Sequence, residues 1–145
     1  MVDSSCEIAD GLHVIAHIPH HHPVPQGNSH LLVQDASGNY VPDDFQHELA
    51  LYTNGLLFTG CAHSGLENIL DACSWPVKMV VGGFHLLDGH EAEEDLVALG
   101  YRLTREYPQT HFCTSHCTGD TAFAALKRAM GHHLHSFCCG TICES

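Results

Sequence analysis

Histidine and cysteine are the residues of this sequence that point most directly to chemistry, because its 145 residues include 15 histidines and 8 cysteines. Both can ligate metals, histidine when neutral and cysteine when deprotonated. Three histidines occupy equivalent places: His63, His85 and His116 each follow an expected strand and precede an expected helix. In open α/β sheets the carboxyl ends of the strands form the ligand-binding rim. The sequence therefore predicts that these three imidazoles converge on one point.

The elements that must position these histidines are predicted from the apolar pattern of the second part of the chain. Between residues 91 and 107, apolar side chains recur every three or four positions, which is typical of a helix with one face on a core. We expect strands over 56–59, 77–81 and 110–114, helices over 65–72, 91–107 and 119–130, and a final strand over 135–138. The predicted fold class is α/β (α+β), as a single domain over residues 1–145.

The first part of the chain is expected to be rich in strands and loops. The pattern predicts strands over 12–17, 30–34 and 48–53. Asn54-Gly55 lies between apolar runs and favours a type I′ hairpin, because both central residues of that turn take positive φ. Residues 18–28 contain three prolines and show no periodicity, so we expect a loop there.

Composition and charge exclude several classes of protein. Five basic residues against 17 acidic ones give a net charge of −12, which argues against nucleic-acid binding. The sequence contains no run of about 18 apolar residues, which is the length needed for a helix to span a membrane. The sequence starts without a secretory signal pattern, so we expect a cytoplasmic protein with reduced cysteines. The cysteines form no C-x-x-C pair, and a zinc ribbon is therefore not indicated.

Three segments that contain the candidate histidines resemble the metallo-β-lactamase superfamily. They are residues 59–70 (TGCAHSGLENIL), 81–86 (VGGFHL) and 115–119 (SHCTG). The most similar branch comprises metal-dependent hydrolases of the 4-(β-D-ribofuranosyl)aminobenzene 5′-phosphate synthase-like, 7,8-dihydropterin-6-methyl-linked kind. The acidic segment at 43–51 and the end at 140–142 also resemble that branch. The resemblance spans about residues 12–144.

The resemblance is to the second half of that family only. It implies half of an αββα sandwich, with a mixed sheet and helices on one face. The first half of the family carries an H-x-H-x-D-H motif that supplies much of the metal centre, and this motif is absent from the present sequence. We therefore expect a fragment of a longer protein, or a natural half that completes its core with a partner.

The metal site that the resemblance implies consists of His63, His85 and His116. His63 and His116 match positions that bind metal in the family, whereas His85 lies near the place where other branches have a bridging aspartate. The expected cofactor is zinc, alternatively iron or manganese, as one or two ions. The expected activity is hydrolysis of a phosphoester or related ester in a small-molecule substrate by metal-activated water. Because half of the site is missing, we expect weak or no activity from this chain alone.

Other readings remain open at this stage. A non-enzymatic, histidine-rich zinc- or copper-binding protein is the alternative function, using the histidines at 20–22 and 132–135. Cys61 and Cys117 are candidate thiolate ligands or nucleophiles, and Asp44 and Glu48 are candidates for acid–base or capping roles. Half a sandwich leaves one sheet face uncovered, and this predicts a homodimer or association with the missing N-terminal half. The residues expected on that bare face are Leu56, Phe58, Val80, Val81 and Phe112.

Overall fold

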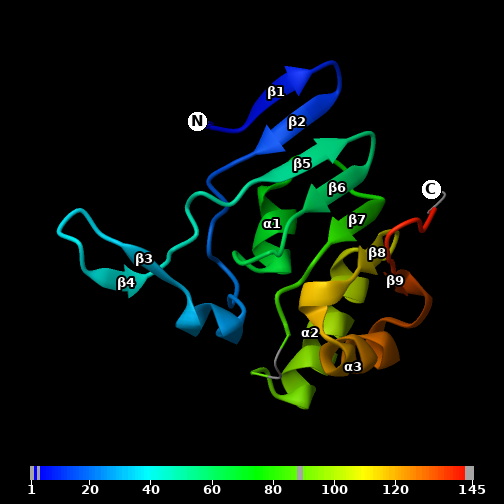
Figure 1. Ribbon diagram of the computed structural model, residues 1–145. Coiled ribbons are helices and arrows are strands. Elements are labelled where there is room, and N and C mark those ends of the chain that lie inside the picture. Colours follow the sequence, from blue (N-terminus) through cyan, green and yellow to red (C-terminus); the bar gives the residue numbers. More distant parts are fainter. Residues whose placement is uncertain (1, 3, 88–89, 143–145) are drawn as a thin grey trace.

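A seven-stranded mixed sheet is the main element of the computed structural model, which describes residues 2, 4–87 and 90–142. From one edge to the other the strands lie in the order β1-β2-β5-β6-β7-β8-β9 (Figure 1). Their bounds are β1 (Cys6–Ala9), β2 (Leu12–Ile15), β5 (Ala50–Thr53), β6 (Leu56–Thr59), β7 (Met79–Gly82), β8 (His111–Thr114) and β9 (Leu134–Ser136). A separate hairpin pairs β3 (Leu32–Gln34) with β4 (Tyr40–Pro42) and projects away from this sheet (Figure 1).

The strand direction divides the main sheet into two parts. The pairs β1–β2, β2–β5 and β5–β6 are antiparallel. The pairs β6–β7, β7–β8 and β8–β9 are parallel. Parallel neighbours need a long crossover. The helices in these crossovers are α1 (Leu66–Ala72), α2 (Glu93–Glu106) and α3 (Asp120–Met130). The α/β (α+β) class is thus confirmed, and the ends of β6, β7 and β8 lie side by side in what we call the carboxyl rim.

The three helices cover one face of the sheet. Four buried residues on that face lie in register on neighbouring strands: Leu57, Val80, Phe112 and Leu134. They belong to one apolar cluster with Ile69 of α1, Leu103 of α2 and Leu126 of α3, and all seven side chains are fully buried. Burying a side chain of this size stabilises a fold by about 1.5–3 kcal/mol. This cluster holds the three helices against the parallel strands.

Close packing between α2 and α3 depends on a glycine. A Cβ atom added to Gly100 would lie only 2.7 Å from the Cβ of Ala129. The two backbones can therefore approach each other only because this position has no side chain. This contact packs α2 closely against α3.

The opposite face of the sheet is apolar and is not covered by the helices. Leu51 of β5 and Phe58 of β6 form a registered pair on this face and are 36% and 48% exposed. Three further apolar side chains on this face are half-buried: Leu56, Met79 and Val81. We call this surface the open face.

Two residues that the sequence assigned to the bare face lie on the other side. Leu56, Phe58 and Val81 are on the open face as expected, but Val80 and Phe112 were assigned wrongly. Successive side chains of a strand point to opposite faces. Val80 and Phe112 pair with each other in the core row and have no exposed surface.

The first part of the chain differs more from its sequence prediction. The Asn54-Gly55 hairpin is confirmed, with φ of +48° and +89° at the two turn residues. Strands β1 and β4 were not predicted, and every residue of both is exposed. Part of the expected loop becomes a 3-10 helix over Gln26–His30. In the part of the chain that the structure describes, no helix is long and apolar enough to cross a membrane.

A stack of rings ties the antiparallel strands to the segment after α1. Trp75, the single tryptophan of the sequence, stacks on Tyr52 of β5 at 5.2 Å between ring centroids. It also stacks on His13 of β2 at 4.2 Å between ring centroids. The Tyr52 hydroxyl donates a hydrogen bond of 3.0 Å to the carbonyl of Pro76. Trp75 therefore sits where the antiparallel and parallel parts of the molecule meet.

Candidate metal centre

His63 is held firmly at the carboxyl rim, four residues after β6 ends. The side-chain amide of Asn28 donates a 2.7 Å hydrogen bond to the His63 carbonyl, so the Oδ1 atom of Asn28 faces the ring. Nδ1 of His63 lies 3.1 Å from this Oδ1 and donates to it. The ring also stacks on Phe45 at 4.4 Å with an interplanar angle of 4°. This arrangement leaves the lone pair on Nε2 available for a metal ion.

Glu48 shapes the turn that carries His63. One carboxylate oxygen accepts a hydrogen bond of 2.8 Å from the His63 amide, and the other accepts one of 2.6 Å from the Ser64 amide. Both oxygens are thus used to hold the backbone, which supports the capping role rather than acid–base work. Asp44 has a similar local role, because its carboxylate accepts a hydrogen bond from the Gln46 amide.

His85 follows β7 and lies against His63. The two ring centroids are 4.1 Å apart. His85 has a φ of +48°, a conformation that costs energy for a residue other than glycine and that is found at functional sites. Its Nε2 atom is buried and has no hydrogen-bond partner among the described residues. A Cβ atom added to Gly27 would lie 3.2 Å from this nitrogen, so the absence of a side chain there leaves space next to it.

Burial favours the neutral form of both imidazoles. It lowers the pKa of His63 and of His85 below the usual value of 6.5. Charge on His63 lowers the pKa of His85 further, because the two rings are adjacent. Neutral imidazole is the form of histidine that binds metal. The surroundings of His63 and His85 therefore favour the form that can bind a metal ion over the positively charged form.

The third predicted ligand is only partly described. His116 begins a short 3-10 helix over His116–Thr118, directly after β8, which places its backbone on the carboxyl rim. Its imidazole lies outside the described part of the chain. Among the described residues, no group of three histidine, cysteine, aspartate or glutamate side chains is arranged to hold a metal ion. The described part of the site is therefore the pair His63 and His85.

The candidate thiols lie next to each other beside this pair. The Sγ atom of Cys117 is 4.0 Å from the carbonyl oxygen of Cys61. Burial raises the pKa of the Cys61 thiol above its usual 9.0, and the neighbouring Cys117 raises it further. Burial thus disfavours the thiolate of Cys61, which is the nucleophilic form of cysteine.

A polar cavity of about 520 Å³ opens at the carboxyl rim beside the His116 turn. Ser115 and Ser136 contribute to its wall, together with Thr114, Thr118 and Asp120 at the start of α3. The Oγ1 atoms of Thr114 and Thr118 are 2.5 Å apart and share a hydrogen bond. Hydroxyl and backbone N–H donors are suited to phosphate oxygens or to other polar groups.

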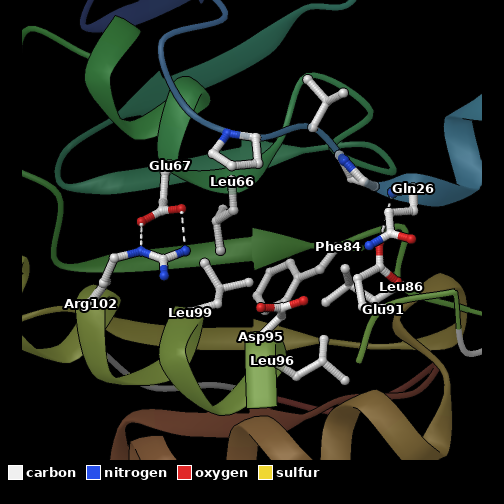
Figure 2. Close-up of a pocket in the computed structure, with 13 residues that line it drawn as sticks. Gln26, Leu66, Glu67, Phe84, Leu86, Glu91, Asp95, Leu96, Leu99 and Arg102 are labelled. Atoms are coloured by element: carbon white, nitrogen blue, oxygen red, sulfur yellow. Dashed lines mark hydrogen bonds and ion pairs between the residues drawn. The ribbon is translucent and has the colours of Figure 1, made fainter. Parts of the chain in front are cut away.

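A second cavity of about 280 Å³ lies on the helical side, between residues 23–26 and α2 (Figure 2). Arg102 in its wall is paired with Glu67 at 2.7 and 3.0 Å, as the dashed lines in Figure 2 show. Glu91 accepts a hydrogen bond from the Gln26 amide through one oxygen, and its other oxygen is buried without a partner among the described residues. Asp95 adds another carboxylate. This acidic lining does not suit an anionic substrate.

Comparison with known proteins assigns no family to the chain. No protein-family profile matches it. It is similar to the uncharacterized protein MJ0448 of Methanocaldococcus jannaschii, with 29% identity over 93 residues. The matched part is 63% of the present chain and 35% of that relative. The chain thus covers about a third of the length of the protein that it resembles.

Three residues of the site were not predicted from the sequence: Asn28, Phe45 and Gly27. Asn28 and Gly27 come from the proline-rich stretch and the 3-10 helix after it, where no periodicity indicates which side chains point inward. Phe45 has a φ of +52° and is 7% exposed, which brings it from the acidic segment onto the His63 ring. In the sequence Phe45 is an isolated aromatic residue between polar ones, inside the segment 43–51 that resembles the family.

Proposed function

We propose that this chain carries part of the metal centre of a metal-dependent hydrolase of the metallo-β-lactamase type. The observation that carries the proposal is the contact between His63 and His85 at the carboxyl rim, where the buried Nε2 of His85 has no hydrogen-bond partner among the described residues. The backbone of His116 lies on the same rim, after the next parallel strand. Three successive turns thus bring histidines to the place where α/β sheets bind their ligands.

The donor set fits a zinc ion, and also iron or manganese, as one or two ions. Neutral imidazoles are common ligands for zinc and iron, and three histidines with one water make a usual catalytic zinc site. When bound, such an ion supplies a coordinated water of lowered pKa. His63, His85 and His116 would hold the ion. Asn28 would fix the tautomer of His63, and the stacked ring of Phe45 would limit its rotation.

The substrate that we propose is a small molecule with a phosphoester or related ester. The cavity beside the His116 turn is about 520 Å³, which is within the usual range for small-molecule sites. Ser115 and Ser136 in its wall carry hydroxyl groups that can donate hydrogen bonds to phosphate oxygens. This wall contains one carboxylate, that of Asp120, whereas the wall of the second cavity contains Glu67, Glu91 and Asp95. The carboxyl rim therefore supports ester binding better than the helical side does.

We propose further that the active unit needs more than this chain. The chain covers 35% of its archaeal relative, and its open face presents Leu51 and Phe58 to solvent. A homodimer, or a missing N-terminal half that carries the H-x-H-x-D-H motif, would bury this face. The chain alone would then be weakly active or inactive. The cytoplasm is the proposed compartment, where thiols such as Cys61 and Cys117 stay reduced.

Metal content tests the proposal. The metal-free chain is dialysed against zinc with a thiol reductant that does not bind the metal, and zinc per chain is measured by elemental analysis. We expect His63→Gln, His85→Gln and His116→Gln each to lose zinc, while His21→Gln in the exposed loop and Cys61→Ser retain it. Equal losses in His63→Gln and His21→Gln would contradict the site.

Activity is tested separately with bis(p-nitrophenyl) phosphate as the probe. The zinc- or manganese-loaded chain is assayed alone and together with the part of the archaeal relative that the chain does not match. We expect turnover that rises when the second polypeptide is present and that is abolished by His63→Gln. Turnover that is the same in His63→Gln would exclude hydrolysis at this centre.

The alternative function is a non-enzymatic, histidine-rich metal-binding protein. The observation that favours it is a second group of imidazoles, because the rings of His132 and His133 lie 4.2 Å apart close to His111. Several zinc ions per chain, bound without preference among the histidines and without turnover, would support this alternative over the hydrolase.

A further inference from the structure

Four histidines gather at the end of the parallel strands opposite to the carboxyl rim. His111 is the first residue of β8, His132 and His133 belong to the 3-10 helix over Gly131–His133, and His135 lies in β9. The ring centroids of His132, His133 and His135 are 6.2, 5.7 and 5.4 Å from that of His111. We call this group the β8–β9 cluster. It is independent of the proposed hydrolase centre, because His63 and His85 follow the other ends of their strands.

The strand register explains why these rings meet. His135 pairs with Cys113, two residues after His111 and on the same side of β8. Both histidines therefore project on the side of the sheet that the helices do not cover, and they are diagonal neighbours across two parallel strands. The turn before β9 brings His132 and His133 to the same corner. The positions of His111 and His135 are thus fixed by the pairing of two strands and do not depend on flexible loops.

The distance between His111 and His135 suits a shared metal ion. The Nδ1 atom of His111 is 3.2 Å from the Nε2 atom of His135. Two nitrogens bound to one tetrahedral zinc ion at about 2.0–2.1 Å lie about 3.3 Å apart. The pair thus already has nearly the spacing of two zinc ligands. Without metal, the same pair forms one N–H···N hydrogen bond, which a metal ion would replace.

His133 has the orientation of a further ligand. Its Nδ1 atom is 3.0 Å from the carbonyl oxygen of Thr110 and donates to it. This hydrogen bond leaves the lone pair of His133 on Nε2, and metal-binding histidines are commonly oriented in this way. The described side chains are not already arranged as a three-ligand set. A modest rotation of His133, or a water molecule, would complete the coordination.

Charge near the cluster sets a limit on its affinity. Lys127 donates a hydrogen bond of 2.5 Å to the carbonyl of Leu134, the residue next to His135. Burial lowers the pKa of His135, and the neighbouring Lys127 and His111 lower it further. The positive charge of Lys127 opposes a cation at this corner and so limits the affinity of the cluster for a metal ion.

We infer that His111 and His135, with His133 or water as the third ligand, form a second metal site for a divalent transition ion such as Zn²⁺. The ion would connect β8 to the edge strand β9 and to the 3-10 helix before it. Imidazole ligands without carboxylates favour zinc, copper or nickel over magnesium or calcium. The site would thus respond to transition metals and not to Mg²⁺.

Zinc stoichiometry tests this inference on the full chain. Zinc per chain and its dissociation constant are measured by equilibrium dialysis for the wild type, His111→Gln/His135→Gln and the control His20→Gln/His21→Gln. We expect the first variant to lose one zinc ion, or at least tenfold in affinity at one site, while the control retains both. Unchanged binding in His111→Gln/His135→Gln would overturn the inference. Mg²⁺ that competes equally with zinc would also overturn it.

Two further measurements separate this site from the hydrolase centre and from loss of fold. His63→Gln should still bind zinc at the β8–β9 cluster, so zinc that is lost entirely in His63→Gln would contradict the inference and leave the proposed function intact. In the unmodified chain, zinc should shift the imidazole NMR resonances of His111 and His135. Zinc that leaves these two resonances in place would contradict the site even if the double variant does not fold.

Discussion

The molecule contains two groups of histidines that differ in how firmly they are held. At the carboxyl rim, His63 has a hydrogen bond to Asn28, an aromatic stack on Phe45 and a backbone turn fixed by Glu48. In the β8–β9 cluster, the fixed contacts are those within the group and the hydrogen bond from His133 to a carbonyl. The rim is therefore preorganised by its surroundings, whereas the cluster is positioned mainly by strand register. A catalytic site requires side chains that are held in place before the metal ion or substrate binds.

The largest expected effect comes from removing the carboxylate that fixes the rim. Glu48→Ala leaves the His63 and Ser64 amides without their partner, and we expect a loss of about 1–3 kcal/mol in the free energy of unfolding. Urea unfolding measures this loss. Asp44→Ala is the matched control, because its single hydrogen bond of 3.2 Å is exposed. Equal destabilisation by both variants would mean that the rim is not specially held.

Asn28→Ala distinguishes the two groups directly. Loss of a partner that orients a ligand typically lowers metal affinity about 10- to 100-fold. We expect this loss at the rim and no change in zinc binding at the β8–β9 cluster, as measured by zinc titration in the His111→Gln/His135→Gln and His63→Gln backgrounds. Asn39→Ala in the exposed β3–β4 turn is the control. A similar loss at both sites would remove the distinction between them.

Gly27→Ala tests whether the space beside His85 is functional. The added Cβ would lie 3.2 Å from Nε2, which is tighter than an ordinary contact, and we expect zinc affinity at the rim to fall several-fold. Gly60→Ala is a fitting control, since its Cβ would meet nothing within 4 Å. If Gly27→Ala binds zinc as the wild type does, Nε2 of His85 is not a ligand.

The smallest expected effect is on the pH dependence of stability. Folding lowers the pKa of His63 and His85 below 6.5, so the folded metal-free chain binds fewer protons than the unfolded one. The stability that these two histidines contribute is present above pH 6.5 and is lost as the pH falls through their lowered pKa values. Urea midpoints between pH 7.5 and 5.5 should decline, and His63→Gln/His85→Gln should reduce the decline. An unchanged slope in that variant would show that other groups dominate.

The parts of the fold that were predicted from the sequence are those with strong local signals. The strand over 56–59 and the Asn54-Gly55 turn were predicted at their observed positions, because apolar runs and turn residues are read locally. The meeting of His63 and His85 was also predictable, since consecutive parallel strands end at one rim. Strand β9 was predicted over 135–138, whereas it begins one residue earlier and ends two residues earlier.

Contacts between distant segments were not predictable in the same way. Asn28 reaches His63 from 35 positions earlier in the chain, and neither residue carries a pattern that indicates the other. The diagonal pair of His111 and His135 depends on the register of β8 against β9, which is set by burial of Phe112 and Leu134 on the opposite face. These contacts follow from packing of the whole domain and not from any local stretch of sequence.

The ring stack of Trp75 gives this protein a built-in optical reporter. Its indole emission comes from one residue only, and that residue touches β2 and β5 while belonging to the segment that leads into β7. Undocking of the antiparallel strands would expose the indole and shift its emission to longer wavelengths before the helices melt. The unfolding curves recorded by fluorescence and by far-ultraviolet circular dichroism on the same sample would then have different midpoints in denaturant. Coincident curves would instead mean that both parts of the sheet unfold as one cooperative unit.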